Sequence, residues 1–230
     1  MEKNNLAEQA YVTLRDSIQQ FRLAPGTVIS DYYLSQELEM SRTPIRQALV
    51  RLEQDGLVEI GSNNKMMVSR LSITDIREIY EAREAIECKA GQMLIENGGL
   101  QEAQKQELLE LHKMLIQSVE QKNLKGNFSA DSQFHLRIME YAGNERLIWF
   151  FNRLSTQSMR ARYLSAMVPE WFSKTISDHE AILNALLSKN KEQFSISINA
   201  HLDDSIENYG KILNDLPSYA MMNVSVFRQD

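Results

Sequence analysis

Four side chains able to ligate a metal are spaced along the C-terminal half of the chain. Asp131 and His135 lie four residues apart, which places a carboxylate and an imidazole on one face of a helix. His179 and His201 would follow on two later helices. Three imidazoles and one carboxylate suit zinc, nickel or manganese, with further coordination positions open to water or a ligand. The spacing alone leaves a second interpretation open, because a lone histidine on a helix is more often a core or surface residue than a ligand.

Residues 41–58 carry a second set of side chains whose spacing indicates a function. The apolar residues that recur there at helical spacing, and must therefore face a core, are Ile45, Ala48, Leu49 and Leu52. The polar residues on the opposite side, near the start, are Arg42, Thr43, Arg46 and Gln47. A buried stripe with a cationic leading end is typical of a DNA-reading helix, although an ordinary solvated helix face could show the same charges.

Short elements on the N-terminal side of this helix would position it. Ser30 can cap a helix that runs to about Glu39, and Met40-Ser41 then makes a short connection to the next helix. Either Ser41 or Thr43 can cap that next helix. Two helices joined so closely are typical of a helix-turn-helix.

Strand and helix candidates flank the helix-turn-helix. Residues 57–60 and 66–69 are short strand candidates on either side of a hairpin tip at 61–65. Upstream, residues 6–21 form an amphipathic helix, and a turn follows at 24–27. Because a helix-turn-helix followed by a hairpin is a winged domain, we expect residues 1–71 to form a winged helix-turn-helix DNA-binding domain.

This N-terminal module resembles the winged-helix domain of the GntR-family bacterial transcription regulators. The matching stretches are LAPG at 23–26, LSQEL at 34–38, SRTPIRQAL at 41–49 and LEQDGLV at 52–58. The resemblance implies that the start of the third helix reads the major groove of double-stranded operator DNA, while the wing tip approaches the minor groove. The residues it implicates as DNA contacts are Ser41, Arg42, Thr43, Arg46, Tyr32 and Lys65.

The chemistry of these residues fits DNA contacts, with two departures from the family pattern. Arg42 and Arg46 suit hydrogen bonds to guanine, whereas the serine and threonine hydroxyls suit phosphate contacts. The wing tip carries Asn63-Asn64-Lys65, where the family usually has an Arg-Gly pair. Tyr32 stands where relatives often have a basic residue, so it can bond a phosphate but adds no charge.

The charge of the chain bears on its partners. The whole chain has a formal net charge of −6, and residues 1–71 hold 8 Lys and Arg against 9 Asp and Glu. DNA binding would therefore rely on a local cationic stripe and on two copies acting together, so we expect a homodimer. The chain has no apolar run that could span a bilayer, and its charged N-terminus lacks the apolar stretch of a signal peptide. We therefore expect a cytoplasmic protein without a membrane partner.

From about residue 72 onward, glycine and proline become sparse and the pattern turns helical. Candidate helices cover residues 74–96, 101–122, 127–142, 144–166, 170–188 and 191–214. Six helices in this length suit a compact bundle. We therefore expect a mainly α chain in which an all-α bundle at 72–216 follows the winged domain. A tail at 217–230 has no clear period.

The helical half resembles the FCD effector domain of the FadR-like branch of the GntR family. The matching motifs are DSQFH at 131–135, AGN at 142–144, HEAILNAL at 179–186 and AHL at 200–202. The resemblance implies an effector-binding and dimerisation domain, with a divalent transition metal, zinc first and nickel or manganese as alternatives. The ligands it transfers to this chain are Asp131, His135, His179 and His201. His112 matches no ligand of the family, and we expect it to be structural or exposed.

No motif for catalysis accompanies these ligands. The chain lacks Gly-x-Ser-x-Gly, His-Glu-x-x-His and a phosphate-binding glycine loop, which favours a ligand sensor over an enzyme. An open metal position attracts an oxygen of a small organic acid, and a nearby arginine could neutralise the remaining charge. Arg83 matches the family's first-helix arginine, and Arg160 and Arg162 are further candidates for effector binding. Each could equally form a salt bridge with the abundant glutamates.

Together these features predict a ligand-responsive bacterial transcriptional regulator that is a repressor and not an enzyme. A small organic acid at the metal would shift the dimer between two arrangements of its DNA-binding domains, through the linker at 70–72, and so alter operator affinity. Two alternatives stay open. One is a metal-dependent enzyme whose winged domain is an interaction module, and the other is a regulator whose helical domain is only structural.

Overall fold

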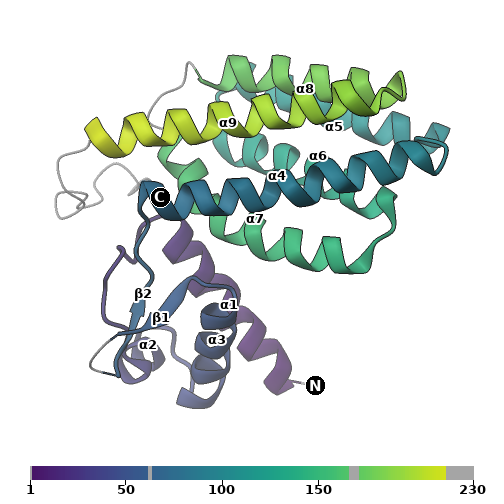
Figure 1. The fold of residues 1–230 in the computed structure, drawn as a ribbon. Coiled ribbons are helices and arrows are strands. Elements are labelled where there is room, and N and C mark those ends of the chain that lie inside the picture. Colours follow the sequence, from purple (N-terminus) through teal and green to yellow (C-terminus); the bar gives the residue numbers. More distant parts are fainter. Residues whose placement is uncertain (1, 62–63, 166–170, 216–230) are drawn as a thin grey trace. The chain divides into compact units, whose positions relative to one another are not determined.

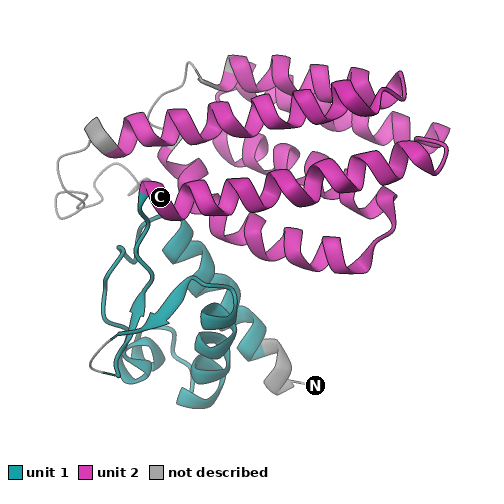
Figure 2. Ribbon diagram, in the orientation of Figure 1, with its two compact units in different colours: residues 1–72, 214–230 teal, residues 73–213 magenta. Residues whose placement is uncertain are grey.

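The computed structural model of the chain describes residues 2–61, 64–165 and 171–215. The chain is mainly α-helical, and its described part contains one two-stranded sheet (Figure 1). It divides into two compact units, the first formed by residues 1–72 and 214–230 and the second by residues 73–213 (Figure 2). The tail expected at 217–230 lies outside the described residues.

The first unit contains three helices followed by a hairpin. Its elements are α1 (Glu2–Gln19), α2 (Asp31–Glu37), α3 (Arg42–Gln54), β1 (Val58–Ile60) and β2 (Met66–Val68). Ser30 caps α2 as predicted, because its hydroxyl accepts a hydrogen bond from the backbone N–H of Tyr33. The helix ends before the predicted Glu39, since that residue has a φ of 51°, in the left-handed region.

Helix α3 has the buried stripe that its sequence predicts. The apolar residues of this stripe, each at most 3% exposed, are Ile45, Ala48, Leu49 and Leu52. They pack in one hydrophobic core with α1 and the hairpin, which contribute Ala10, Leu14, Ile18, Val58 and Val68. Ser41 precedes the helix at the N-cap position, but its side chain makes no capping hydrogen bond. The stripe therefore fixes which side of α3 remains at the surface.

The hairpin forms the predicted wing. Strands β1 and β2 are antiparallel, with Val58 opposite Val68 and Ile60 opposite Met66. A further bridge joins Val28 to Met67, which the local pattern around each strand could not reveal because the two residues are far apart in the chain. At the tip, residues 62–63, which include the expected Asn63, lie outside the described residues.

The described part of the second unit is a bundle of helices. They are α4 (Ile73–Glu96), α5 (Glu102–Glu120), α6 (Leu124–Ala142), α7 (Glu145–Ser165), α8 (Trp171–Leu187) and α9 (Lys191–Asp215), whose last residues pass the boundary of the unit. Helix α6 starts three residues before its predicted start, because Asn123 caps it by accepting a hydrogen bond from the backbone N–H of Gly126. Gly143 ends the helix with a φ of 72°. No described helix is long and apolar enough to cross a membrane.

The interior of the bundle combines close helix packing with buried charge. Helices α4 and α9 approach so closely that a β-carbon at Gly91 would lie 2.0 Å from the ring of Phe194. The buried ionisable side chains of this unit include Arg83, Glu87, Asp131, His135, Arg160, Arg162, His179 and His201. Buried charges must be paired or bind an ion, so this cluster is where the chemistry of the unit is concentrated.

Candidate metal centre and nucleic-acid interface

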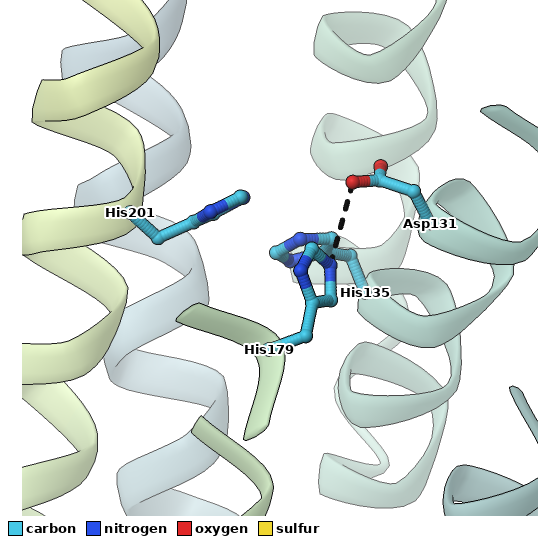
Figure 3. Close-up of side chains that lie close together, drawn as sticks. All are labelled: Asp131, His135, His179 and His201. Atoms are coloured by element: carbon cyan, nitrogen blue, oxygen red, sulfur yellow. Dashed lines mark ion pairs between the residues drawn. The ribbon is translucent and has the colours of Figure 1, made fainter. Parts of the chain in front are cut away.

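Three helices bring the four predicted metal ligands together. Helix α6 supplies Asp131 and His135 from adjacent turns, α8 supplies His179 and α9 supplies His201 (Figure 3). All four are buried, and one ligand atom of each lies within 4.8 Å of the ligand atoms of the others. The two candidate ligands on α6 share a face because four residues make about one helical turn.

The imidazole rings lie against one another rather than in separate environments. The ring centroids are 5.1 Å apart for His135 and His179, 5.2 Å for His135 and His201, and 4.8 Å for His179 and His201. Such a group of rings is suited to a shared ion, because imidazole nitrogens are common ligands of zinc and similar metals.

Contacts around the cluster fix the protonation of two imidazoles. Nδ1 of His135 lies 2.6 Å from Oε2 of Glu87, and Nδ1 of His179 donates to the carbonyl of Thr175 at 2.7 Å. When Nδ1 is the donor, Nε2 of a neutral imidazole keeps a lone pair for a metal. Nδ1 of His201 lies 3.5 Å from Oδ2 of Asp178, a distance too long for a strong hydrogen bond.

Several buried nitrogens of the cluster have no hydrogen-bond partner among the described residues. They are Nε2 of His135, Nε2 of His179 and Nδ1 of His201, of which the last two lie 3.3 Å from Asp131 and 3.5 Å from Asp178 without forming a well-aligned hydrogen bond. Buried polar atoms are nearly always hydrogen-bonded in folded proteins, so three buried nitrogens in one place without a hydrogen bond fit a bound cation. Burial also lowers the pKa of His135 and lowers that of His201 to about 4, which keeps these imidazoles neutral, the form that ligates a metal.

Asp131 is the charged member of the cluster and already has a cationic partner. Its Oδ2 forms an ion pair with Arg162, and its Oδ1 lies 3.3 Å from Nε2 of His179. Burial raises the pKa of Asp131, but the Arg162 guanidinium and His179 outweigh it and hold this pKa well below its usual range. Arg162 is oriented by a further hydrogen bond of 2.8 Å to the hydroxyl of Ser132. The carboxylate is therefore ionised and able to ligate.

Glu87 of α4 is a functional neighbour that the sequence interpretation missed. It accepts a hydrogen bond from Nε of Arg83 at 2.8 Å on one oxygen and contacts His135 with the other. Burial raises its pKa, but Arg83 and His135 lower it to about 2. The spacing of Arg83 and Glu87, four residues apart on a helix, was the available signal, because opposite charges at this spacing form ion pairs.

A small pocket with a cavity volume of about 50 Å³ adjoins the cluster. Its lining includes two of the candidate ligands and both arginines of the adjacent ion pairs: Asp131, His201, Arg83 and Arg162. Arg160, the other predicted effector contact, is buried but does not line this pocket. His112 lies outside the cluster, where its Nε2 is 3.2 Å from the carbonyl of Ile176, as expected for a structural histidine.

The predicted DNA contacts of the first unit are exposed. They are Ser41, Arg42, Thr43 and Arg46 at the start of α3, Tyr32 on α2 and Lys65 before β2. Both arginines form ion pairs with Asp31, the first residue of α2. This pairing was not predicted, because Asp31 is 11 and 15 residues away from its partners.

Comparisons with known proteins agree with this architecture. The family model described as bacterial regulatory proteins, gntR family, matches residues 6–68, and the FCD domain model matches residues 78–204. The chain is 29% identical over 213 residues to the HTH-type transcriptional repressor RspR of Escherichia coli, covering 89% of each chain. It is 26% identical over 212 residues to the HTH-type transcriptional regulator YdhC of Bacillus subtilis, covering 90% of this chain and 92% of that one.

A solved structure shares the fold. E. coli McbR/YncC superposes with a TM-score of 0.76 at 22% sequence identity, covering 90% of this chain and 97% of the other. The relatives are named as transcriptional regulators, which removes the alternative of an enzyme with a winged interaction module. The chain therefore belongs to the GntR family of bacterial transcriptional regulators, in the FadR-like branch that joins a winged helix-turn-helix DNA-binding domain to an FCD domain.

Proposed function

We propose that this regulator binds operator DNA through the start of α3 and acts as a repressor in the cytoplasm, where the chromosome lies. The proposed DNA contacts are Ser41, Arg42, Thr43, Arg46, Tyr32 and Lys65, all of them exposed. Exposure is what contacts to base edges and phosphates require. The repressor role is supported by the relative RspR, which is named a repressor.

A divalent transition metal in the helical unit is the second part of this proposal, with zinc as the first candidate and nickel or manganese as alternatives. Its ligands would be Asp131, His135, His179 and His201. The observation that carries this proposal is the convergence of four buried ligand groups within 4.8 Å, together with their unsatisfied nitrogens. When bound, such an ion acts as a Lewis acid that attracts an oxygen atom of a ligand.

The adjoining pocket supports a small organic acid as the effector. Nη2 of Arg83 is buried and has no hydrogen-bond partner among the described residues, so it can donate to a carboxylate. Arg162 lines the same pocket and brings a second guanidinium close to the candidate ligand Asp131. The polar side chains of Asn127 and Tyr209 also line it, which suits hydroxyl or carbonyl groups on the acid.

The effector would act by shifting a population. In a homodimer, an acid that binds one arrangement of the two DNA-binding domains more tightly than another favours that arrangement, and the spacing of the recognition helices then changes. The acid can change operator affinity only if it binds the two arrangements with different affinities. An acid that binds both arrangements equally tightly would leave operator affinity unchanged. We expect the acid to release DNA.

Elemental analysis tests the metal centre directly. Protein purified without chelator or nickel resin should carry about one transition-metal ion per chain, as expected for one four-ligand site. The double variant His135→Ala, His201→Ala should lose this ion, whereas the control His112→Ala should keep it. A wild-type chain that stays metal-free after dialysis against zinc, or a double variant that keeps its ion, would refute the metal centre and leave the DNA-binding proposal intact.

A regulator with a purely structural helical unit is the second candidate. The ion pair between Asp131 and Arg162 favours it, because this carboxylate is already neutralised without a metal. Zinc should raise the thermal midpoint of the wild-type chain and not that of His179→Ala if the site is a metal centre, since ligands stabilise the state that binds them. Under the structural candidate, zinc leaves both midpoints unchanged.

A further inference from the structure

A single carboxylate, that of Asp31, engages both arginines that are proposed to read DNA. Its Oδ1 accepts a hydrogen bond from Nη2 of Arg42 at 2.8 Å, while its Oδ2 accepts from Nε of Arg42 at 3.2 Å and from Nε of Arg46 at 2.5 Å. The side chain of Asp31 is 20% exposed, compared with 51% for Arg42 and 62% for Arg46. The carboxylate therefore lies partly beneath the two guanidinium groups.

The two arginines are held in different ways. Arg42 donates hydrogen bonds to Asp31 through two of its nitrogens, Nε and Nη2, whereas Arg46 donates only through Nε. The terminal amino groups of Arg46 thus keep their donors for the acceptors on a guanine edge. Hydrogen bonds from Arg42 and then Arg46 lower the pKa of Asp31, so the carboxylate is charged at neutral pH.

A fixed negative charge at this surface has opposite effects on two kinds of DNA complex. It repels the phosphates and keeps the two guanidinium groups from turning toward the backbone of any sequence, which weakens non-specific binding. At the correct sequence the guanidinium groups are already restrained near the start of α3, so less conformational freedom is lost when they meet the bases. Specific binding is therefore weakened less than non-specific binding.

We propose that Asp31 is a specificity-determining residue, which suppresses binding to non-operator DNA by holding Arg42 and Arg46 at the start of α3. This inference rests on the proposed DNA interface. It adds a residue that acts through the two arginines with which it forms ion pairs.

The test compares Asp31→Asn with the wild-type chain on two DNA duplexes by fluorescence anisotropy. One duplex is enriched from a random-sequence pool by the wild-type protein, and the other is its scrambled version. We expect the variant to bind the scrambled duplex more tightly, with a salt dependence steeper by about 0.9 for each phosphate gained. The ratio of the two affinities should fall about tenfold, the discrimination that one good base contact supplies. Asp31→Glu, which keeps the charge, should retain most of the ratio.

Matched variants separate this proposal from simpler effects. Asp16→Asn removes a charge of the same sign from α1, where Asp16 pairs with Arg15, and should leave the ratio of affinities unchanged. If Asp31→Asn behaves like Asp16→Asn, the proposal is wrong. If Arg42→Ala and Arg46→Ala keep their affinity for the enriched duplex, the DNA interface itself is wrong. Thermal unfolding checks every variant, and Asp31→Ser replaces Asp31→Asn should the latter fail to fold.

Discussion

The protonation of His135 is controlled by Glu87, a residue that is not itself a candidate ligand. Nδ1 of His135 lies 2.6 Å from a carboxylate whose pKa is lowered to about 2 by Arg83 and His135 against the effect of burial. An ionised carboxylate can only accept hydrogen bonds, so the imidazole must place its proton on Nδ1. The lone pair of Nε2 is thereby available to an ion.

The variant Glu87→Gln should weaken metal binding without removing a ligand. The amide keeps the size of the side chain but loses the charge that fixes the protonation of His135. Loss of such an outer contact lowers metal affinity about 10–100-fold. Competition with a chromogenic chelator measures this change. Glu81→Gln, an exposed position on the same helix, is the control, and equal zinc affinity in the two variants would contradict the role of Glu87.

The metal-free protein should lose stability as the pH falls below neutrality. Burial lowers the pKa of His201 from 6.5 to about 4, so the unfolded chain binds a proton on this residue at a higher pH than the folded chain does. A depressed pKa of this kind leaves stability at its full value above pH 6.5 and reduces it as the pH falls toward 4. Within this window the free energy of unfolding should drop by about 1.4 kcal/mol per pH unit from this group.

Urea unfolding at pH 7, 6 and 5, in the presence of chelator, measures this dependence. The variant His201→Gln removes the titrating group, so its free energy of unfolding should change less over the same interval. Parallel pH profiles for the two chains would show that another group is responsible.

The candidate ligands were predictable from the sequence, while the contacts that surround them were not. His135, His179 and His201 lie in motifs that resemble a known domain, so their roles could be transferred by position. Arg162 was predicted only as a candidate effector contact, and neither its ion pair with Asp131 nor the contact of Glu87 with His135 was predicted. Such contacts depend on how helices pack, which the periodicity of a single helix does not specify.

At the scale of elements, the sequence indicated the helices better than their ends. Helix α6 starts early because the side chain of Asn123 caps it, and α2 stops early because Glu39 turns left-handed. Each of these two helix ends depends on the conformation of one residue. The hydrophobic repeat of a helix does not predict that conformation. The bridge between Val28 and Met67 was missed for a different reason, since it joins segments that are far apart in the sequence.

The close approach of α4 and α9 gives a prediction for Gly91. In an exposed helix, Gly→Ala would stabilise by about 1 kcal/mol through helix propensity. Here the added β-carbon would lie 2.0 Å from the ring of Phe194, so the two helices or the ring must move. Overpacking of this kind costs about 1–3 kcal/mol, and we expect Gly91→Ala to lower the free energy of unfolding measured in urea.

A second substitution shows whether the ring is the cause. In a Phe194→Leu background the obstructing side chain is smaller. Gly91→Ala should therefore lower the free energy of unfolding by less than it does in the wild-type chain. The coupling energy of this double-mutant cycle should exceed about 0.5 kcal/mol, the limit within which independent sites add. Additive effects would contradict a direct clash.

At the scale of the whole molecule, the two units have different kinds of interior. The core of the first unit is apolar and centres on α3, whereas the second encloses paired charges, Arg83 with Glu87 and Arg162 with Asp131. Breaking such a pair leaves an uncompensated buried charge, which is strongly destabilising. The second unit also holds the four candidate metal ligands, so we expect its stability, rather than that of the first unit, to respond to divalent metal ions.

Reciprocity supplies the prediction that joins the two activities. If zinc changes the affinity for DNA by some factor, DNA must change the affinity for zinc by the same factor. In allosteric proteins this factor is about 5–150. Anisotropy titrations with and without zinc give the first factor, and chelator competition with and without the enriched duplex gives the second. We expect the two factors to agree in the wild-type chain. In His179→Ala, which lacks one candidate ligand, we expect both factors to equal one. Arg46→Ala should lower DNA affinity with and without zinc alike, because it changes the DNA contact and not the coupling. Factors of one in the wild-type chain would mean that the metal stabilises the helical unit without changing the affinity for DNA.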